Sequence, residues 1–249
     1  MKKRLLAMVL TLGLLTGLTA CGGQTSDTEV ESTQEQTSSE ESVMTETEEN
    51  TEQETEQADD ATQTSETSNI LIAYFTMPED IDVSGIDADA GASIVVKDGE
   101  VMGNLEYMAL TIQQAVGGDL FRIETQESYP LDHDPLVDQA AEEQDENARP
   151  ALATHIENLE QYDTILLGYP NWWGDMPQAL YTFLEEYDFS GKTIIPFTAH
   201  GGSGFAGTVG TIENLQSKAI VRDDGLSISR NDVADSAEEV SQWALNLGL

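Results

Sequence analysis

The sequence predicts an α/β fold with a parallel sheet over residues 69–249, and two observations carry that prediction. Short, continuous apolar runs alternate along the chain with longer stretches of helical pattern, which is typical of a parallel sheet with helices on both faces. The runs contain few polar residues at alternate positions, as expected for strands buried on both sides. In such sheets, ligands bind outside the carboxyl ends of the strands, where the strand order reverses.

The individual elements follow from these patterns. Strands are predicted at residues 70–75, 119–124, 164–168 and 193–198, with a fifth at residues 226–229 or 219–222. Helices are predicted at residues 103–116, 135–159 (interrupted near Pro150), 176–187, 208–217 and 232–247. The connection between the first strand and the first helix is unusually long for a βα loop, and long loops often carry function. Within it, residues 92–101 alternate around Asp98 and Gly99, which predicts an inserted β-hairpin over the mouth of the site.

The first 20 residues have the pattern of a bacterial secretory signal, with a basic start and a short apolar run. Leu18-Thr19-Ala20-Cys21 resembles the lipobox of bacterial lipoproteins, which implies cleavage before Cys21 and lipidation of its side chain. The alternative is an ordinary signal peptide with an incidental cysteine. We therefore expect a protein anchored by lipid to the outer face of a bacterial membrane, in an extracytoplasmic location.

The segment after the signal is acidic and of low complexity. Residues 24–68 are rich in Ser, Thr, Glu and Gln, and they contain no aromatic residue, Lys or Arg. Such a composition cannot bury enough apolar surface to form a core. The predicted organisation is thus a signal peptide at 1–20, a lipidated cysteine and disordered linker at 21–68, and a folded domain at 69–249.

Charge and cysteine content exclude several classes of function. The chain has 47 acidic and 10 basic residues, so its surface should repel nucleic acid, which we exclude as a partner. Its single cysteine excludes a disulfide framework and a multi-cysteine metal site. The three histidines are not at metal-ligand spacing, so no metal site is predicted.

Three loops at predicted strand ends could hold a ligand. The first ends in Gly103-Asn104-Leu105 at a helix start, where free amides attract anions. The second, residues 169–177, places two adjacent tryptophans between prolines. The third, residues 198–207, has four glycines and lets backbone amides approach a ligand closely. Simple helix capping, packing beneath the loop and a flexible connector are the respective alternatives.

These loops together resemble the flavodoxin family, in the branch with an insertion before the first helix. The motifs occur in order, each after its own strand: Phe75-Thr76, Gly103-Asn104, Pro170-Asn171-Trp172-Trp173-Gly174 and His200-Gly201-Gly202-Ser203-Gly204. The resemblance implies a flavodoxin-like, doubly wound sheet of five parallel strands in the order 2-1-3-4-5. It also implies that the domain binds flavin mononucleotide (FMN).

By the same resemblance, each loop has a part in binding FMN. The phosphate would be held by Thr76, Gly103, Asn104 and Leu105. One side of the flavin ring would meet Asn171, Trp172, Trp173, Gly174 and Asp175. The pyrimidine side would meet His200, Gly201, Gly202, Ser203, Gly204 and Phe205. The chain departs from the family at the phosphate loop, because Met102 and Leu105 stand where threonines are usual. Thr76 or Ser93 is then the expected substitute hydroxyl donor.

The function implied is one-electron transfer through bound FMN, in which the cofactor carries the redox chemistry. An electron carrier of this kind needs no catalytic acid, base or nucleophile, and the sequence does not identify its redox partner. Two alternatives stay open: a flavin reductase that uses NAD(P)H or a quinone, and a flavin-free anchored binding module. His200 acting as an acid or base would favour the reductase.

Overall fold

The structure, a computed structural model, describes residues 69–249. The predicted signal peptide, the lipidated Cys21 and the acidic linker lie outside the described residues and stay predictions. Among residues 69–249, no helix is both long enough and apolar enough to cross a membrane.

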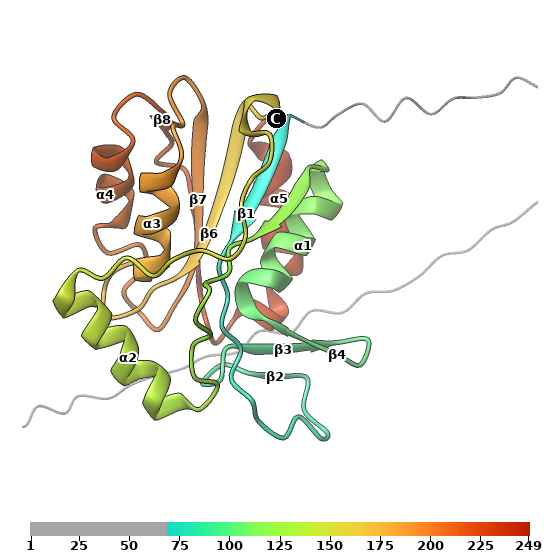
Figure 1. The fold of residues 1–249 in the computed structure, drawn as a ribbon. Helices are drawn as coiled ribbons and strands as arrows, with labels where there is room; N and C mark the ends of the chain where they lie inside the picture. The colour runs from blue at the N-terminus through green and yellow to red at the C-terminus, as the bar shows by residue number, and fades with distance from the viewer. Residues whose placement is uncertain (1–68) are drawn as a thin grey trace, which may run out of the picture. The chain divides into compact units, whose positions relative to one another are not determined.

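A twisted parallel sheet forms the centre of this domain (Figure 1). Its strands are β1 (Ile70–Tyr74), β5 (Asp119–Arg122), β6 (Thr164–Pro170), β7 (Thr193–His200), β8 (Ile220–Val221) and β9 (Leu226–Ser229). They are ordered β5-β1-β6-β7, and then β8 and β9 both pair in parallel with β7. This confirms the flavodoxin-like order. The two segments that the sequence offered as alternatives for the fifth strand both form strands. Strand β8 pairs with the first half of β7, and β9 pairs with its second half.

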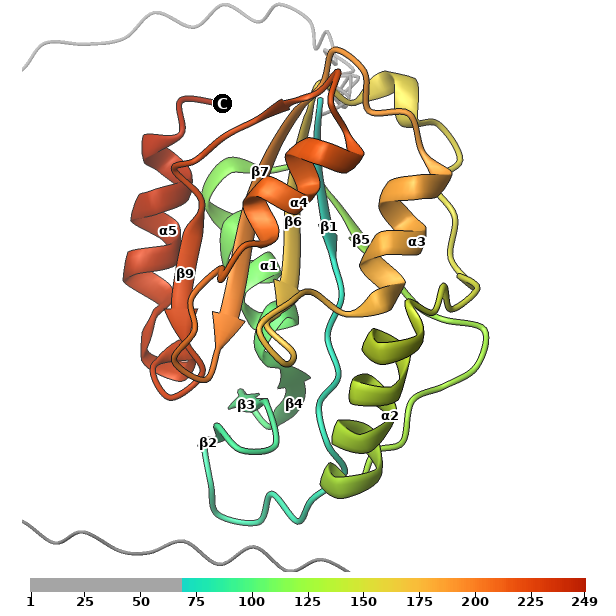
Figure 2. The same ribbon diagram turned by 90° about the vertical axis from the view of Figure 1, so that its left-hand side faces the viewer.

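Helices cover both faces of the sheet, as predicted (Figure 2). One face carries α1 (Asn104–Val116) and α5 (Ala237–Asn246), and the other carries α3 (Gln178–Glu186) and α4 (Thr208–Leu215). The remaining helix, α2 (His133–Glu146), lies beyond the carboxyl end of the sheet, on the α3 side. Each face has its own hydrophobic core, and residues of β1 alternate between the two: Ile72 packs on the α1 side and Ala73 on the α3 side. This alternation explains why the strand is apolar throughout.

The insertion after β1 forms a small antiparallel sheet at the carboxyl end of the main sheet. It contains β2 (Ala88–Asp89), β3 (Ile94–Lys97) and β4 (Glu100–Gly103). Strands β3 and β4 are the predicted hairpin, with Asp98 and Gly99 at its turn. Strand β4 leads directly into α1, so the hairpin fixes the backbone at the start of that helix.

One predicted helix is wrong over half its length. The prediction of helix at 135–159 holds only as far as Glu146, because Asn147 takes a left-handed conformation with φ of 50° and ends α2. The chain then runs in extended form past Pro150, and Leu152 bridges Thr125. A short 3₁₀ turn, Leu159–Gln161, precedes β6. Similarly, the last helix begins at Ala237 rather than 232, after a 3₁₀ turn at Val233–Asp235.

Candidate functional site

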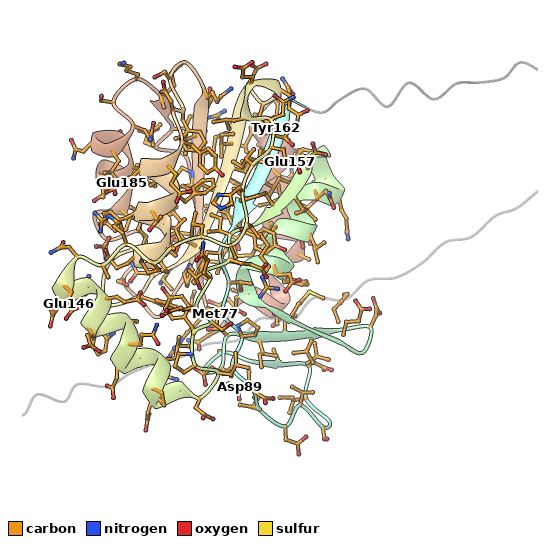
Figure 3. All side chains as sticks on the ribbon, in the orientation of Figure 1. Met77, Asp89, Glu146, Glu157, Tyr162 and Glu185 are labelled. Atoms are coloured by element: carbon orange, nitrogen blue, oxygen red, sulfur yellow. The ribbon has the colours of Figure 1, made fainter. Side chains whose placement is uncertain are left out.

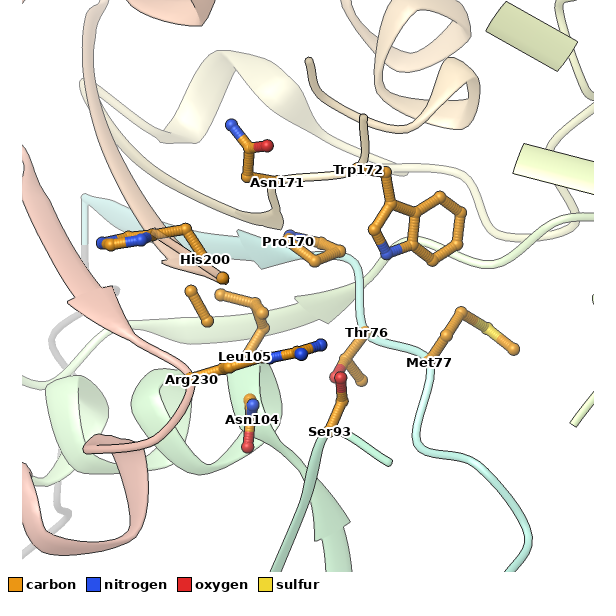
Figure 4. Close-up of a pocket in the computed structure, with 12 residues that line it drawn as sticks. Thr76, Met77, Ser93, Asn104, Leu105, Pro170, Asn171, Trp172, His200 and Arg230 are labelled. Atoms are coloured by element: carbon orange, nitrogen blue, oxygen red, sulfur yellow. The ribbon is translucent and has the colours of Figure 1, made fainter. Parts of the chain in front are cut away.

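A cleft lies where the carboxyl ends of β1, β6, β7 and β9 meet the insertion. It consists of two adjoining hollows, both partly open to solvent. The two hollows share Met77, Ser93, Asn171, Trp172 and Arg230, so they form one continuous site. Figure 4 shows the first hollow, which Thr76, Asn104, Leu105, Pro170, His200 and Gly201 also line.

The loop after β1 and the start of α1 are in close contact in this cleft. The Oγ1 atom of Thr76 occupies the space that a side chain at Gly103 would need, so only glycine fits there. Thr76 is 2% exposed, and no group of the described residues hydrogen-bonds its hydroxyl. The Asn104 side chain is equally buried, lines the cleft, and is likewise without a protein hydrogen bond. The fully enclosed unpaired side-chain oxygens of the described domain are those of Thr182 and Ser227, so the polar atoms of Thr76 and Asn104 are open to the cleft and are suited to a polar ligand.

Two backbone amides at the start of α1 are already hydrogen-bonded within the protein, one of them to the insertion. The backbone amide of Asn104 donates to the carbonyl of Ser93 at 3.0 Å, and that of Gly103 donates to the Glu106 carboxylate at 3.4 Å. Later amides of the first turn remain for a ligand. Ser93 itself has a left-handed backbone with φ of 59°, a conformation that a residue other than glycine seldom adopts and that often marks a functional site.

Met102 and Leu105, the two positions where the sequence resemblance led us to expect threonine, are part of the protein core here. Met102 is 8% exposed and Leu105 is 2% exposed, and both belong to the hydrophobic cluster of the α1 face. Their side chains stabilise the packing of the insertion and α1. Apolar side chains thus replace the two threonine hydroxyls at this point, and the Met102 side chain helps to pack the insertion against the core.

The tryptophan loop after β6 holds its two tryptophans differently. The Trp172 ring packs edge-on against Phe75 and Tyr129, with ring centroids 5.6 and 5.5 Å apart. The Trp173 ring is 61% exposed, and its Nε1 donates to the carbonyl of Val137 in α2 at 3.1 Å. Trp172 borders both hollows and Trp173 only the larger one. Of the two tryptophans, Trp172 is the one that packs against other aromatic rings.

Asn171 joins the tryptophan loop to the glycine loop after β7. Its Nδ2 donates to the carbonyl of Gly204 at 3.0 Å, and its Oδ1 accepts from the Ser203 hydroxyl at 3.0 Å. The same Oδ1 accepts from the amide of Gly174, which has φ of 80°. One side chain thus fixes the relative positions of the two loops.

Several predicted ligand residues lie outside the cleft or point away from its centre. The Asp175 carboxylate turns away to accept from the Tyr181 hydroxyl at 2.9 and 3.1 Å, where it helps burial to raise the pKa of Tyr181 to about 12. Phe205 packs near Tyr169 in the α3-side core. His200 borders the cleft, but its Nδ1 accepts from the amide of Gly202 at 2.9 Å and its ring points away from Trp172 (Figure 4). These residues support the loops from behind.

The structure also brings residues to the cleft that the sequence did not indicate. Arg230, directly after β9, borders both hollows, and it is the one basic residue that does so among residues 69–249. Glu79 of the insertion and His133 of α2 meet across the larger hollow, 2.6 Å apart. The hydrogen bond and the charge of Glu79 raise the pKa of His133 above its ordinary value. Position after the fifth strand was the only available signal for Arg230, because parallel strand ends meet at one edge.

A doubly wound sheet with a cleft between the loops after β6 and β7 defines the class of flavodoxin-like α/β proteins. A sequence model described as flavodoxin matches residues 94–247, and the chain belongs to the flavodoxin family.

The solved structures to which this chain is similar are distant in sequence. A candidate flavoprotein from Bacteroides eggerthii is 23% identical, with a TM-score of 0.49, and the match covers 69% of this chain and 97% of the Bacteroides chain. A Lactobacillus acidophilus flavoprotein in complex with FMN is 20% identical, with a TM-score of 0.46 and coverage of 70% and 97%. An FMN-bound flavodoxin from Fusobacterium nucleatum is 14% identical, with a TM-score of 0.39 and coverage of 72% and 96%. No curated protein matches the chain.

Proposed function

We propose that the domain binds FMN and carries electrons one at a time between partner proteins. The observation that carries this proposal is the cleft, where two buried polar side chains without protein partners, Thr76 and Asn104, lie at a helix start. Next to them are a loop with an aromatic wall and a glycine-rich loop, held together by Asn171. Flat aromatic and polar surfaces at opposite ends of one cleft match a ligand with a ring system and a phosphate.

The residues of the cleft divide into two groups by chemistry. Thr76, Asn104 and the first turn of α1 would hold the phosphate, because hydroxyl, amide and backbone N–H groups all donate to phosphate oxygens. Asn171, Trp172 and Gly201 would border the flavin ring. Bound FMN supplies the redox chemistry, and the protein's part is to position the ring and to limit its exposure to water.

We further propose that the domain works at the outer face of a bacterial membrane, held there by lipid on Cys21. This rests on the signal-like start of the sequence and the acidic spacer that follows. Residues 69–249 contain 32 acidic and 7 basic residues, and exposed acids such as Glu146, Glu157 and Glu185 are spread over α2, α3 and the segment before β6 (Figure 3). A redox partner with a basic docking surface fits this charge best.

A visible absorption spectrum of the purified full chain tests flavin binding. We expect a yellow protein that releases FMN, rather than the dinucleotide, on denaturation. A chain that stays colourless after incubation with excess FMN and removal of free flavin would refute the proposal and favour a flavin-free module. For a chain that does bind FMN, a reductive titration with two resolved one-electron steps supports electron transfer, whereas a single two-electron step favours a reductase.

A further inference from the structure

We propose that Arg230 is the phosphate-binding cation of this cleft and replaces the two missing threonine hydroxyls. This inference rests on the proposed FMN function and adds a specificity: the site would select the phosphorylated flavin over riboflavin. Three observations lead to it, namely the position of the guanidinium, its lack of a protein counter-ion, and the acidity of its surroundings.

The Arg230 side chain crosses the floor of the first hollow. It starts after β9 and points toward Thr76 and Ser93 (Figure 4). Its Nε and Cζ lie 3.7 and 3.8 Å from where a Cβ on Gly201 would be, so the guanidinium passes along the backbone of the glycine loop. It therefore reaches the end of the cleft where the buried Thr76 hydroxyl and Asn104 amide are without partners.

Arg230 also differs from the other arginines of the described domain in having no carboxylate partner. Arg122, Arg149 and Arg222 each lie within 4.0 Å of an Asp or Glu oxygen. Within residues 69–249, Arg230 makes no such ion pair, although acidic residues outnumber basic ones 32 to 7. A guanidinium that stays unpaired in such a sequence, at the mouth of a cleft, is well placed for an anionic ligand.

A cation is needed at this end because the local charges oppose phosphate. The Glu106 carboxylate lies at the start of α1, where it bonds Gly103 and offsets the positive end of the helix dipole. The net negative charge of the domain adds a repulsive field. A phosphate monoester carries a charge of about −1.5 to −2 near neutral pH. A guanidinium can meet two of its oxygens at once with charge-assisted hydrogen bonds, which hydroxyls alone do not match.

The test measures the dissociation constants of FMN and riboflavin by quenching of flavin fluorescence. It compares the full-length wild type with Arg230→Gln and Arg230→Lys. Lys97→Gln, at the exposed end of β3 and away from the cleft, is the matched control for loss of one positive charge. We expect wild type to prefer FMN, and Arg230→Gln to weaken FMN binding about 10- to 100-fold, as for loss of a hydrogen bond to a charged group. Riboflavin binding should stay within about twofold. Arg230→Lys should recover part of the FMN affinity, because the positive charge remains but the planar group that can donate to two phosphate oxygens at once is lost.

The possible failures are distinguishable. A wild type that binds neither flavin refutes the proposed function itself. A wild type that binds FMN, with Arg230→Gln binding it equally well or no worse than Lys97→Gln, refutes the role of Arg230. Equal loss of FMN and riboflavin in Arg230→Gln also overturns it, because the side chain would then act on the ring or on the fold. Thermal unfolding of each variant separates those last two cases.

Discussion

The two ends of the cleft differ in whether their polar side chains are hydrogen-bonded to the protein. At the end near the tryptophan and glycine loops, the polar side chains are used by the protein: Asn171 has three hydrogen bonds to neighbouring loop residues, and His200 bonds Gly202. At the end near the insertion, Thr76, Asn104 and Arg230 make no side-chain hydrogen bond to the rest of the described domain. One end is already fixed in shape, whereas the other keeps its polar groups for a ligand.

This difference suggests where specificity lies. A pre-formed pair of loops binds a flat ring largely through shape, and it should treat FMN and riboflavin alike. An end that keeps unpaired donors gains only from a ligand that supplies the matching acceptors. Changes at the two ends should therefore be separable by comparing the affinities of FMN and riboflavin.

The largest effect is expected for Gly103→Ala. A Cβ at this position would overlap Oγ1 of Thr76 and approach its Cβ to 3.1 Å, in a buried junction that has little room to move. We expect a loss of about 2–3 kcal/mol in the free energy of unfolding, as for an overpacked core, and loss of FMN binding. Denaturant unfolding gives the first value and fluorescence titration the second.

Two further variants sharpen this prediction. Adding Thr76→Ala to Gly103→Ala removes the clashing hydroxyl, so it should restore much of the stability but little of the FMN affinity. Gly210→Ala, within α4 and with open space around its Cβ, is the control and should be neutral or slightly stabilising. A Gly103→Ala protein as stable as wild type would show that the Thr76–Gly103 contact is not tight in solution.

A smaller effect is expected for Asn171→Ala at the other end of the cleft. It removes two hydrogen bonds that join the two loops and one within the tryptophan loop, and we expect a cost of about 2 kcal/mol in stability. FMN and riboflavin should both bind about 10-fold more weakly, since the ring loses its fixed walls. Asn246→Ala, at the exposed end of α5, is the control. Selective loss of FMN alone in Asn171→Ala would contradict the division between the two ends.

Most of the fold could be predicted from the sequence because its strands are unusually uniform. The run 70–75 is apolar at every position, and β1 does face a separate core on each side. The error at 147–159 arose because Ala-rich and acidic residues kept a helical pattern up to Pro150. The left-handed turn at Asn147 and the bridge between Thr125 and Leu152 depend on tertiary contacts that no local pattern encodes.

The site was predicted only as far as its loops. Motif order placed Thr76, Asn104, Asn171, Trp172 and His200 at one cleft, and the structure brings them together there. Whether a loop side chain faces the cleft or supports the loop is decided by partners elsewhere in the chain. Asp175 bonds Tyr181, six residues further along the chain in α3, and Arg230 reaches Gly201 from the end of the neighbouring strand β9.

The smallest effect concerns the contact between Glu79 and His133, which closes the larger hollow between the insertion and α2. The bond to Glu79 raises the pKa of His133, while Asp134 adds to the rise and Arg230 opposes it. A raised pKa means that the folded state binds the proton more tightly than the unfolded state does. The stabilisation is therefore complete below the unfolded value of about 6.5, and it is lost as the pH rises through the raised value. Because the His133 side chain is 53% exposed, solvent screening limits the contribution to about 0.5 kcal/mol at most.

Thermal unfolding of wild type and His133→Gln from about pH 5.5 to about pH 8.5 tests this contact. The gap between their unfolding temperatures should narrow with rising pH. A His133→Gln gap that stays constant or widens with pH would mean that the charged pair does not hold the insertion against α2.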